Sequence, residues 1–292
     1  MSFNSDLKNE LCSASYVCRN CATAECLGLM LYAHRFSSDG IKIISENPLM
    51  RKHVSSLCRQ VMGVQLISDG NALYLTEPEQ LELAFSAFGY EYRRSALMLN
   101  RAFVEDDCCR AAFLRGILLS GGYASSPDKN YHLELVTPRL SVAQQTMNLL
   151  SEMGLAPGYI VRRGNHILYF KDSSVIEDVL TTAGAPNSAM EIMVKKVEKD
   201  LNNNINRKVN CDNANLDKTV AAAGKQIDAI KKLRDGDKWD KLPASLKETA
   251  ELRLNNPLSS LSDLCKMHSG ELSRPGLAAR LRKLVNLSKE SD

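Results

Sequence analysis

The sequence lacks the features of an exported or membrane-spanning protein. No apolar stretch approaches the ~18 residues that a membrane helix needs, and the N-terminal MSFNSDLKNELC has no basic patch followed by an apolar run. Nine cysteines are scattered over 292 residues, a length at which a hydrophobic core makes stapling by disulfides unnecessary. We therefore expect a cytoplasmic protein whose cysteines are reduced thiols.

Sequence patterns of the common enzyme classes are also missing. The chain has no GxSxG, GxxxxGK(S/T) or GxGxxG pattern and no convincing acid–base pair. Cys18-x-x-Cys21, with Cys26 nearby, is typical of half a zinc site, but no second CxxC or HxxxH follows at zinc spacing, and Cys108 and Cys109 are adjacent. We therefore expect no metal, no cofactor and no small-molecule substrate.

An excess of one charge sign is nearly absent, because the net charge is only +3. The distribution of charge is more informative. Residues 1–189 carry 17 Lys and Arg against 19 Asp and Glu, residues 190–240 carry 11 against 9, and residues 241–292 carry 9 against 6. Since nucleic-acid phosphates attract Lys and Arg, we expect any nucleic-acid-binding charge to lie mainly beyond residue 190.

Two copies of one pattern fill the first two-thirds of the chain, over about residues 22–95 and 107–186. The first copy runs from AECLGLMLYA to LELAFSAFG, and the second from FLRGILLSGG to VIEDVLTTAGA. Gly28 and Gly116 lie 88 residues apart and Gly89 and Gly184 lie 95 apart, as expected for a tandem duplication with loop insertions. The duplication predicts a pseudo-twofold domain over residues 1–189, with one face built from both copies.

Each copy predicts the same order of helices and strands. In the second copy a helix over about 107–120 and the strand YHLELV precede an amphipathic helix that ends at Gly154. A hairpin follows, in which YIVRR and HILYF flank a two-residue turn at Gly164-Asn165. The first copy places its hairpin around Asp69-Gly70-Asn71.

Small residues occur in the first helix of each copy, within CLGLMLYA and FLRGILLSGG. Gly28, Gly116 and Ser120 allow two helices to approach backbone to backbone. We predict that the two helices pair along the pseudo-twofold axis, as core packing and not as a catalytic site.

This order of elements resembles the LAGLIDADG homing-endonuclease domain, an α+β fold of the αββαββα type. In that family the glycine-bearing helices form the interface, the strands form a DNA-gripping saddle, and an acidic residue at the foot of each helix holds a catalytic metal. The resemblance places Ala33 and Gly121 at those positions, where neither can bind a metal. Asp39 and Asp128 lie downstream in turn-like contexts, where aspartate is common for local reasons. We therefore expect no nuclease activity; an active metal-dependent endonuclease is the alternative.

Further motifs resemble the WhiA family: YHLE at 131–134, LRG followed by GG, the asparagine-rich stretch 206–215 and a helical ending with RLRKL. The resemblance covers about residues 3–284. It implies a degenerate LAGLIDADG domain joined to a C-terminal helix-turn-helix, in a transcription regulator of bacterial cell division, chromosome segregation or sporulation. The implied partner is double-stranded promoter DNA, at the nucleoid; another regulator or RNA polymerase is a candidate protein partner for the saddle.

The last hundred residues predict helices. Residues 190–240 form a charged, asparagine-rich linker, with one helix before the asparagines and another after them. Residues 241–292 form a small all-α domain with helices over ASLKETAELRL, LSSLSDLCKM and RPGLAARLRKLV. Ser269-Gly270 supplies the turn of a helix-turn-helix. The apolar face of its first helix consists of Leu258, Leu261, Leu264 and Cys265.

The third of these helices is the predicted DNA reader. Its inward residues recur at helical spacing and are Leu277, Leu281, Leu284 and Val285. Ser273 is the expected N-cap, and Pro275 lies in the first turn. We expect Arg274 to contact a base edge, whereas the phosphates are contacted by Arg280, Arg282 and Lys283. The alternative is a solvated basic helix in a small bundle.

Two other polar sets are weaker candidates. The asparagine-rich residues are expected to cap and turn the connector, with Arg207 as the exception that contacts DNA. A hydrogen-bonding surface for the DNA backbone or bases is the alternative. The saddle has few basic side chains, which lie in a slightly acidic domain and are Lys42, Arg162, Arg163, His166 and Lys171. We expect this face to bind DNA weakly or to hold a protein partner; an interaction scaffold with weak DNA binding is a further alternative.

Overall fold

The computed structural model describes residues 2–93, 96–268, 270 and 272–289. The chain divides into two compact units, Met1–Asp200 and Leu201–Asp292. Within the described residues, no helix is both long enough and apolar enough to cross a membrane.

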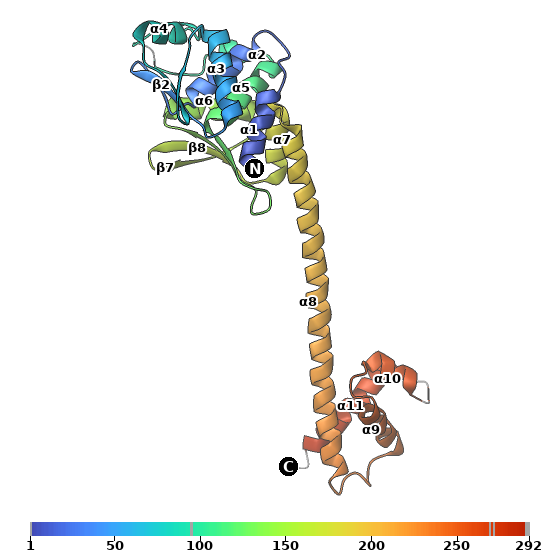
Figure 1. Ribbon diagram of the computed structural model, residues 1–292. Helices are drawn as coiled ribbons and strands as arrows, with labels where there is room; N and C mark the ends of the chain where they lie inside the picture. The colour runs from blue at the N-terminus through green and yellow to red at the C-terminus, as the bar shows by residue number, and fades with distance from the viewer. Residues whose placement is uncertain (1, 94–95, 269, 271, 290–292) are drawn as a thin grey trace. The chain divides into compact units, whose positions relative to one another are not determined.

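The two copies fold into the same set of elements within the first unit (Figure 1). The first copy consists of α2 (Cys21–Leu31), β1 (Arg35–Ser37), β2 (Gly40–Ile44), α3 (Pro48–Met62), β3 (Ile67–Asp69), β4 (Ala72–Leu75) and α4 (Pro78–Ser86). The second consists of α5 (Asp107–Gly121), β5 (Gly122–Ala124), β6 (Leu133–Thr137), α6 (Leu140–Glu152), β7 (Gly158–Arg162), β8 (Asn165–Phe170) and α7 (Ser173–Ala183). α1 (Phe3–Ser13) precedes the first copy and η1 (Arg101–Phe103) lies between the copies. The predicted duplicated α+β fold is confirmed.

Each copy forms one antiparallel four-stranded sheet, and the strand orders correspond: β1-β2-β4-β3 and β5-β6-β8-β7. The hairpin of the second copy turns one residue earlier than predicted. Arg162 pairs with Asn165, so the turn residues are Arg163 and Gly164, both at positive φ (52° and 78°). Positive φ at both central positions is the geometry of a type I′ turn, which matches the twist of the flanking strands.

The central helices α2 and α5 pack against each other through their glycines. A Cβ atom on Gly28 would lie 2.3 Å from the Phe113 carbonyl oxygen, and one on Gly116 would lie 2.0 Å from the Glu25 carbonyl oxygen. These distances leave no room for a side chain, so the predicted backbone-to-backbone approach is present. Every residue of α2 except Thr23 is buried, because this helix lies at the centre of the duplicated domain.

A buried ion pair joins elements of both copies. Glu25 of α2 is fully buried, and its carboxylate lies 2.6 Å from Nε2 of His53 and accepts a hydrogen bond of 3.3 Å from Arg115 of α5. Arg115 also donates to the carbonyl of Ala183. A buried charge requires such partners, so this network fixes how α2, α3, α5 and α7 pack.

α8 (Pro186–Arg234) is a single helix of 49 residues, so the prediction of two helices separated by an asparagine-rich junction is wrong. No proline or glycine lies between Asn187 and Ala223, and asparagine in a helix interior costs only about 0.7 kcal/mol relative to alanine. Residues 201–218 are all exposed. The asparagines therefore lie on an exposed helix surface and do not cap or turn a connector.

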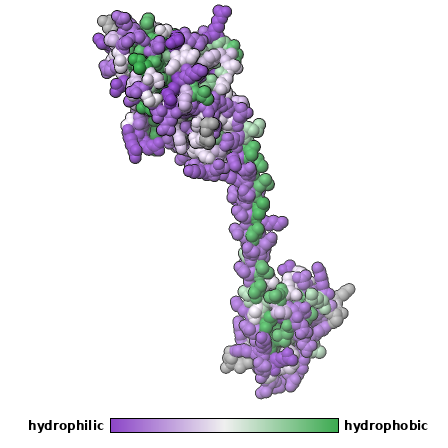
Figure 2. Space-filling view, viewed as in Figure 1, coloured by the Kyte–Doolittle hydropathy of each residue, from purple (hydrophilic) through white to green (hydrophobic). Residues whose placement is uncertain are grey.

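One side of α8 carries exposed apolar side chains, which Figure 2 shows as a line along the helix. They include Val194, Val197, Leu201, Ile205, Val209, Leu216 and Val220. Most follow one another after three or four residues, a spacing that places them on one face. α8 is therefore amphipathic and differs from a uniformly solvated spacer.

The second unit contains α9 (Ala244–Asn255), α10 (Leu261–Met267) and α11 (Arg274–Lys289), which pack with the last turns of α8. Leu264 belongs to the core and Leu261 packs against it, as predicted. Leu258 is 77% exposed; its expected place on the apolar face is wrong because α10 begins only at Leu261, after the N-cap Ser260. The buried core consists of Ile230, Leu233, Leu246, Ala250, Leu264, Leu277, Leu281 and Leu284.

Candidate nucleic-acid interface

The start of α11 has the predicted cap. The backbone N–H of Gly276 donates to Oγ of Ser273 at 3.3 Å, and the N–H of Leu277 donates to the Ser273 carbonyl at 2.9 Å. Pro275 occupies the first turn, where a missing N–H costs nothing. The predicted turn residue Ser269 lies outside the described residues, whereas the N–H of Gly270 donates to Nδ1 of His268 at 3.0 Å.

The two faces of α11 differ in character. Leu277, Leu281 and Leu284 are at most 1% exposed, and Val285 is half-buried. Arg274, Arg282 and Lys283 are exposed. None of these three cations forms an ion pair with another described residue. Their charge is therefore available to a ligand outside the chain.

Arg280 differs from the other predicted contacts, because its guanidinium faces α9. Nη1 lies 3.4 Å from the carbonyl of Ser245, 3.5 Å from Oγ1 of Thr249 and 3.4 Å from Nε2 of His268. Arg280 follows Leu277 by three residues and precedes Leu284 by four, so helical geometry places it near the buried side. We expected Arg280 to face outward because it is charged, but its spacing from Leu277 and Leu284 places it near the buried side of the helix.

Arg253 of α9 is a basic residue that the sequence analysis missed. It is only 2% exposed, and Nη1 donates to the Ser259 carbonyl at 2.8 Å. Burial lowers the pKa of this guanidinium below its usual value. The side chain holds the segment between α9 and α10 and so positions the helix-turn-helix. Its only signal in the sequence is an arginine between Leu252 and Leu254.

The second candidate region lies on α8. Arg207 is exposed there, as are the asparagine-rich residues around it. These residues all lie within one continuous helix, so their side chains point outward from the helix and do not cap a helix end. Arg207 is thus accessible, and the structure assigns it no partner among the described residues.

The sheets offer few free basic groups. Arg162 donates to Oε2 of Glu134 at 2.8 Å, Lys42 lies 5.2 Å from the Tyr74 ring centroid, and Lys171 lies 5.0 Å from that of Tyr169. Arg163 lies in the β7–β8 turn. His166 shares the face of its buried neighbour Leu168, since residues two apart on a strand point the same way, and its Nδ1 lies 2.7 Å from the Tyr159 hydroxyl.

Among the described residues, no acid lines the pocket at the foot of the central helices. A pocket of about 320 Å³ is lined there by Tyr32, Ala33, His34, Ser120, Gly121, Gly122, Val136, Pro138 and Asn165. Ala33 is fully buried, and a Cβ atom on Gly121 would lie 2.5 Å from the Val136 carbonyl oxygen. Ser120, predicted at the helix interface, lines this pocket one turn beyond the Gly116 contact. Asp39 and Asp128 are exposed and do not line it, and Asp128 pairs with Lys195 at 3.2 Å.

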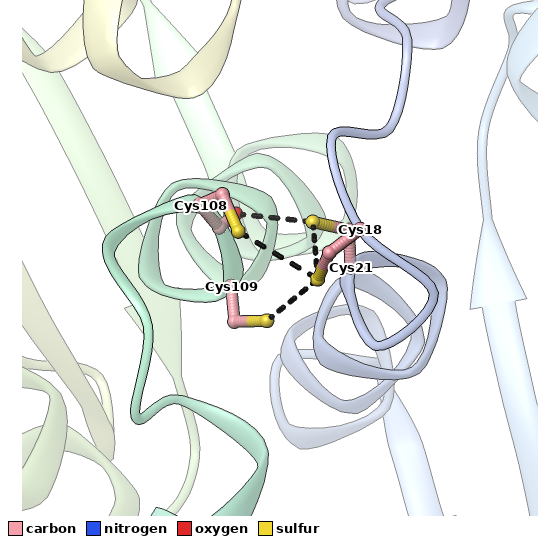
Figure 3. Close-up of side chains that lie close together, drawn as sticks. All are labelled: Cys18, Cys21, Cys108 and Cys109. Carbon is pink, nitrogen blue, oxygen red and sulfur yellow. Dashed lines mark hydrogen bonds between the residues drawn. The ribbon is translucent and has the colours of Figure 1, made fainter.

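The opposite end of the same two helices gathers four cysteines (Figure 3). The sulfurs of Cys18, Cys21, Cys108 and Cys109 all lie within 4.8 Å of one another, and among the described residues they are the group of His, Cys, Asp and Glu side chains placed to hold a metal. From the sequence we expected no metal site, because no second CxxC or HxxxH follows Cys18-x-x-Cys21 at zinc spacing and Cys108 and Cys109 are adjacent. Cys21 and Cys108 lie 87 residues apart in the chain. The structure brings the two pairs together by pairing α2 with α5.

Comparisons with known proteins cover both units. The chain matches the model of the WhiA LAGLIDADG-like domain over residues 110–202 and that of the WhiA C-terminal HTH domain over residues 205–288. It is 33% identical to a probable cell division protein WhiA of Ruminiclostridium cellulolyticum over 99% of this chain and 97% of that protein. A relative of the same name in Clostridium novyi is 32% identical over 99% of this chain and 98% of that protein. The crystal structure of full-length WhiA from Thermotoga maritima has the same fold, with a TM-score of 0.61 at 22% identity over 99% of each chain.

Proposed function

The chain belongs to the WhiA family, and we propose that it acts as a sequence-specific DNA-binding regulator without nuclease activity. The observation that carries this proposal is α11: a capped helix of a helix-turn-helix with three exposed cations, Arg274, Arg282 and Lys283, that form no ion pair with another described residue. A helix of this kind enters the major groove with its N-terminal residues at the base edges.

We assign different DNA contacts to these cations. Arg274 stands at the front of the helix, where an arginine can donate two hydrogen bonds to guanine, worth about 1–3 kcal/mol of discrimination. Arg282 and Lys283 lie two to three turns further on and contact phosphates, which set affinity and salt dependence without reading sequence. Arg207 on α8 adds a further phosphate contact. Arg280 braces α9 and is not part of this set.

We further propose that the regulated promoters belong to cell division, chromosome segregation or sporulation. The relatives that match over nearly the whole chain carry the name probable cell division protein. A single small reader binds DNA weakly, so the regulator acts with help from a second contact, either Arg207 or a protein partner such as RNA polymerase or another regulator.

Binding titrations with the full chain test whether these cations make different DNA contacts. Fluorescence anisotropy against promoter fragments and scrambled DNA at several salt concentrations gives both the specificity ratio and the salt slope. Arg274→Ala should relax the preference for the correct sequence by about 1–3 kcal/mol, whereas Arg282→Ala should weaken all sequences alike and reduce the salt slope by about 1. Lys52→Ala removes an exposed charge of the first unit and should change neither quantity. Identical effects of the two arginine variants would contradict the assignment.

The absence of nuclease activity is the second part of the proposal. The pocket at the foot of α2 and α5 offers no carboxylate to a hard dication, which requires oxygen ligands to generate an attacking hydroxide. Plasmid DNA incubated with the full chain and magnesium or manganese should therefore stay supercoiled. Nicking that increases with protein concentration and stops with a chelator would contradict it.

A further inference from the structure

We infer that Cys18, Cys21, Cys108 and Cys109 form a closed site for one zinc ion, which joins the two copies of the duplicated domain. The site lies in the first unit, at the N-terminal ends of α2 and α5, away from the pocket at Ala33 and Gly121. α2 and the segment just before it supply two ligands and α5 supplies the other two, so neither helix alone can complete the site.

The spacing of the sulfurs matches one tetrahedral metal. Sγ of Cys18 lies 3.5 Å from that of Cys21, 3.5 Å from that of Cys109 and 3.6 Å from that of Cys108. Four thiolates at about 2.3 Å from a zinc ion stand about 3.8 Å apart. A disulfide requires sulfurs about 2.05 Å apart. A multi-iron cluster needs its own iron and sulfide atoms between the cysteines, and a group this compact has no room for them.

The duplication explains how the site arose from helix pairing. Cys21 and Cys109 are 88 residues apart, the same offset as Gly28 and Gly116. These two cysteines therefore occupy equivalent positions in the first turns of α2 and α5, and the glycine contact that brings the helices together also brings their sulfurs together. Cys18 and Cys108 do not correspond by this offset, so each copy contributes its second ligand differently.

The four sulfurs lie in a largely enclosed place beside two helix N-termini. Cys21 and Cys109 are 1% and 2% exposed, and Cys18 and Cys108 are half-buried. The caps Asn20 and Asp106 make no side-chain hydrogen bond to the helix ends, so backbone N–H groups remain at both N-termini. The positive ends of two helices stabilise the net negative charge of a zinc ion with four thiolates.

A site with four protein ligands is structural, because no position is open for substrate. Zinc binding would contribute to folding by joining segments far apart in the sequence. Removal of zinc should therefore loosen the α2–α5 contact and leave the helix-turn-helix core unaffected.

Thiol protection and metal content test the site in the full chain. Protein purified without chelator should contain one zinc per chain by elemental mass spectrometry. Alkylation followed by peptide mass spectrometry should find Cys18, Cys21, Cys108 and Cys109 protected in the zinc-loaded chain and labelled after chelation, with Cys211 labelled in both. Cobalt added to the stripped chain should give the intense visible absorption of tetrahedral thiolate ligation.

Variants extend the test. Cys18→Ser and Cys108→Ser should each weaken zinc binding by more than about 100-fold, since even the loss of an outer-shell partner costs about 10–100-fold. The matched control Cys211→Ser, at an exposed cysteine of α8, should bind zinc as the unmodified chain does. If these variants fail to fold, the protection pattern of the unmodified chain decides. A Cys18–Cys21 disulfide, several irons with sulfide, or no zinc-dependent protection would overturn the inference.

Discussion

Single residues at the centre of the molecule decide how closely the two copies approach. Gly28 and Gly116 face each other's helix backbone at distances that a Cβ atom cannot occupy. Glu25, one turn before Gly28, adds a buried carboxylate that is acceptable only because His53 and Arg115 pair with it. Small size and paired charge thus act one turn apart on the same helix.

Gly116→Ala is expected to destabilise the first unit by about 3 kcal/mol or more. Its Cβ atom would lie 2.0 Å from the Glu25 carbonyl oxygen, and overpacking of this kind usually costs about 1–3 kcal/mol even where side chains can move. Urea unfolding followed by circular dichroism measures the change.

Gly224→Ala is the matched control, because it lies in the helix α8 with no atom near its Cβ position. There alanine should stabilise the helix by about 0.5–1 kcal/mol. Equal effects of the two substitutions would show that the α2–α5 contact is looser than described.

The composition of a segment does not by itself decide its secondary structure, and α8 is the clearest case. Asparagine favours caps and turns, yet the asparagine-rich segment lies inside one long helix. The helix is continuous because the stretch from Asn187 to Ala223 contains no residue that breaks a helix. The absence of proline and glycine over this stretch, and not its asparagine content, determines that α8 is one helix.

Replacing Asn206, Asn210 and Asn213 together by alanine should therefore retain or increase the helix content of α8, by about 0.5 kcal/mol of helix propensity per residue. Hydrogen exchange of the α8 amides measures this directly. DNA affinity should change by less than about twofold (~0.4 kcal/mol), whereas Arg207→Ala should lower it at all sequences. A loss of sequence preference in the triple variant would instead assign base contacts to these asparagines.

At the scale of the whole molecule, the first unit has a LAGLIDADG-like fold, and no carboxylate lines the pocket at the foot of α2 and α5. Position 121 also has no space for a side chain, because a Cβ atom there would lie 2.5 Å from the Val136 carbonyl oxygen. The sheets also leave few basic groups free for phosphate.

The double variant Ala33→Asp, Gly121→Asp is therefore expected to remain inactive on plasmid DNA with magnesium or manganese. It should also unfold at lower denaturant concentration than the unmodified chain, because Ala33 is fully buried and position 121 has no space. Isothermal titration with manganese is the companion measurement. Metal-dependent cleavage by this variant would show that the pocket is still a catalytic site.

Most of the architecture was predictable from the sequence. The repeated pattern gave the duplicated fold, the spacing of Leu277, Leu281 and Leu284 gave the buried side of α11, and Ser273 with Pro275 gave its start. Helical spacing and capping depend on residues within about one helical turn, so they can be read directly from the sequence. The hairpin turn was off by one residue, since Arg163 rather than Asn165 adopts a positive φ.

Contacts between residues far apart in the chain were decided only by the tertiary structure. The sequence by itself determined the order of the elements, the glycines that pair α2 with α5, and the missing acids at positions 33 and 121. The folded chain decided that Arg280 braces α9, that Gly121 has no space for a side chain, and that two cysteine pairs meet. The physical reason is that each of these depends on which surfaces pack together, and periodicity along one helix or strand carries no record of what lies opposite it.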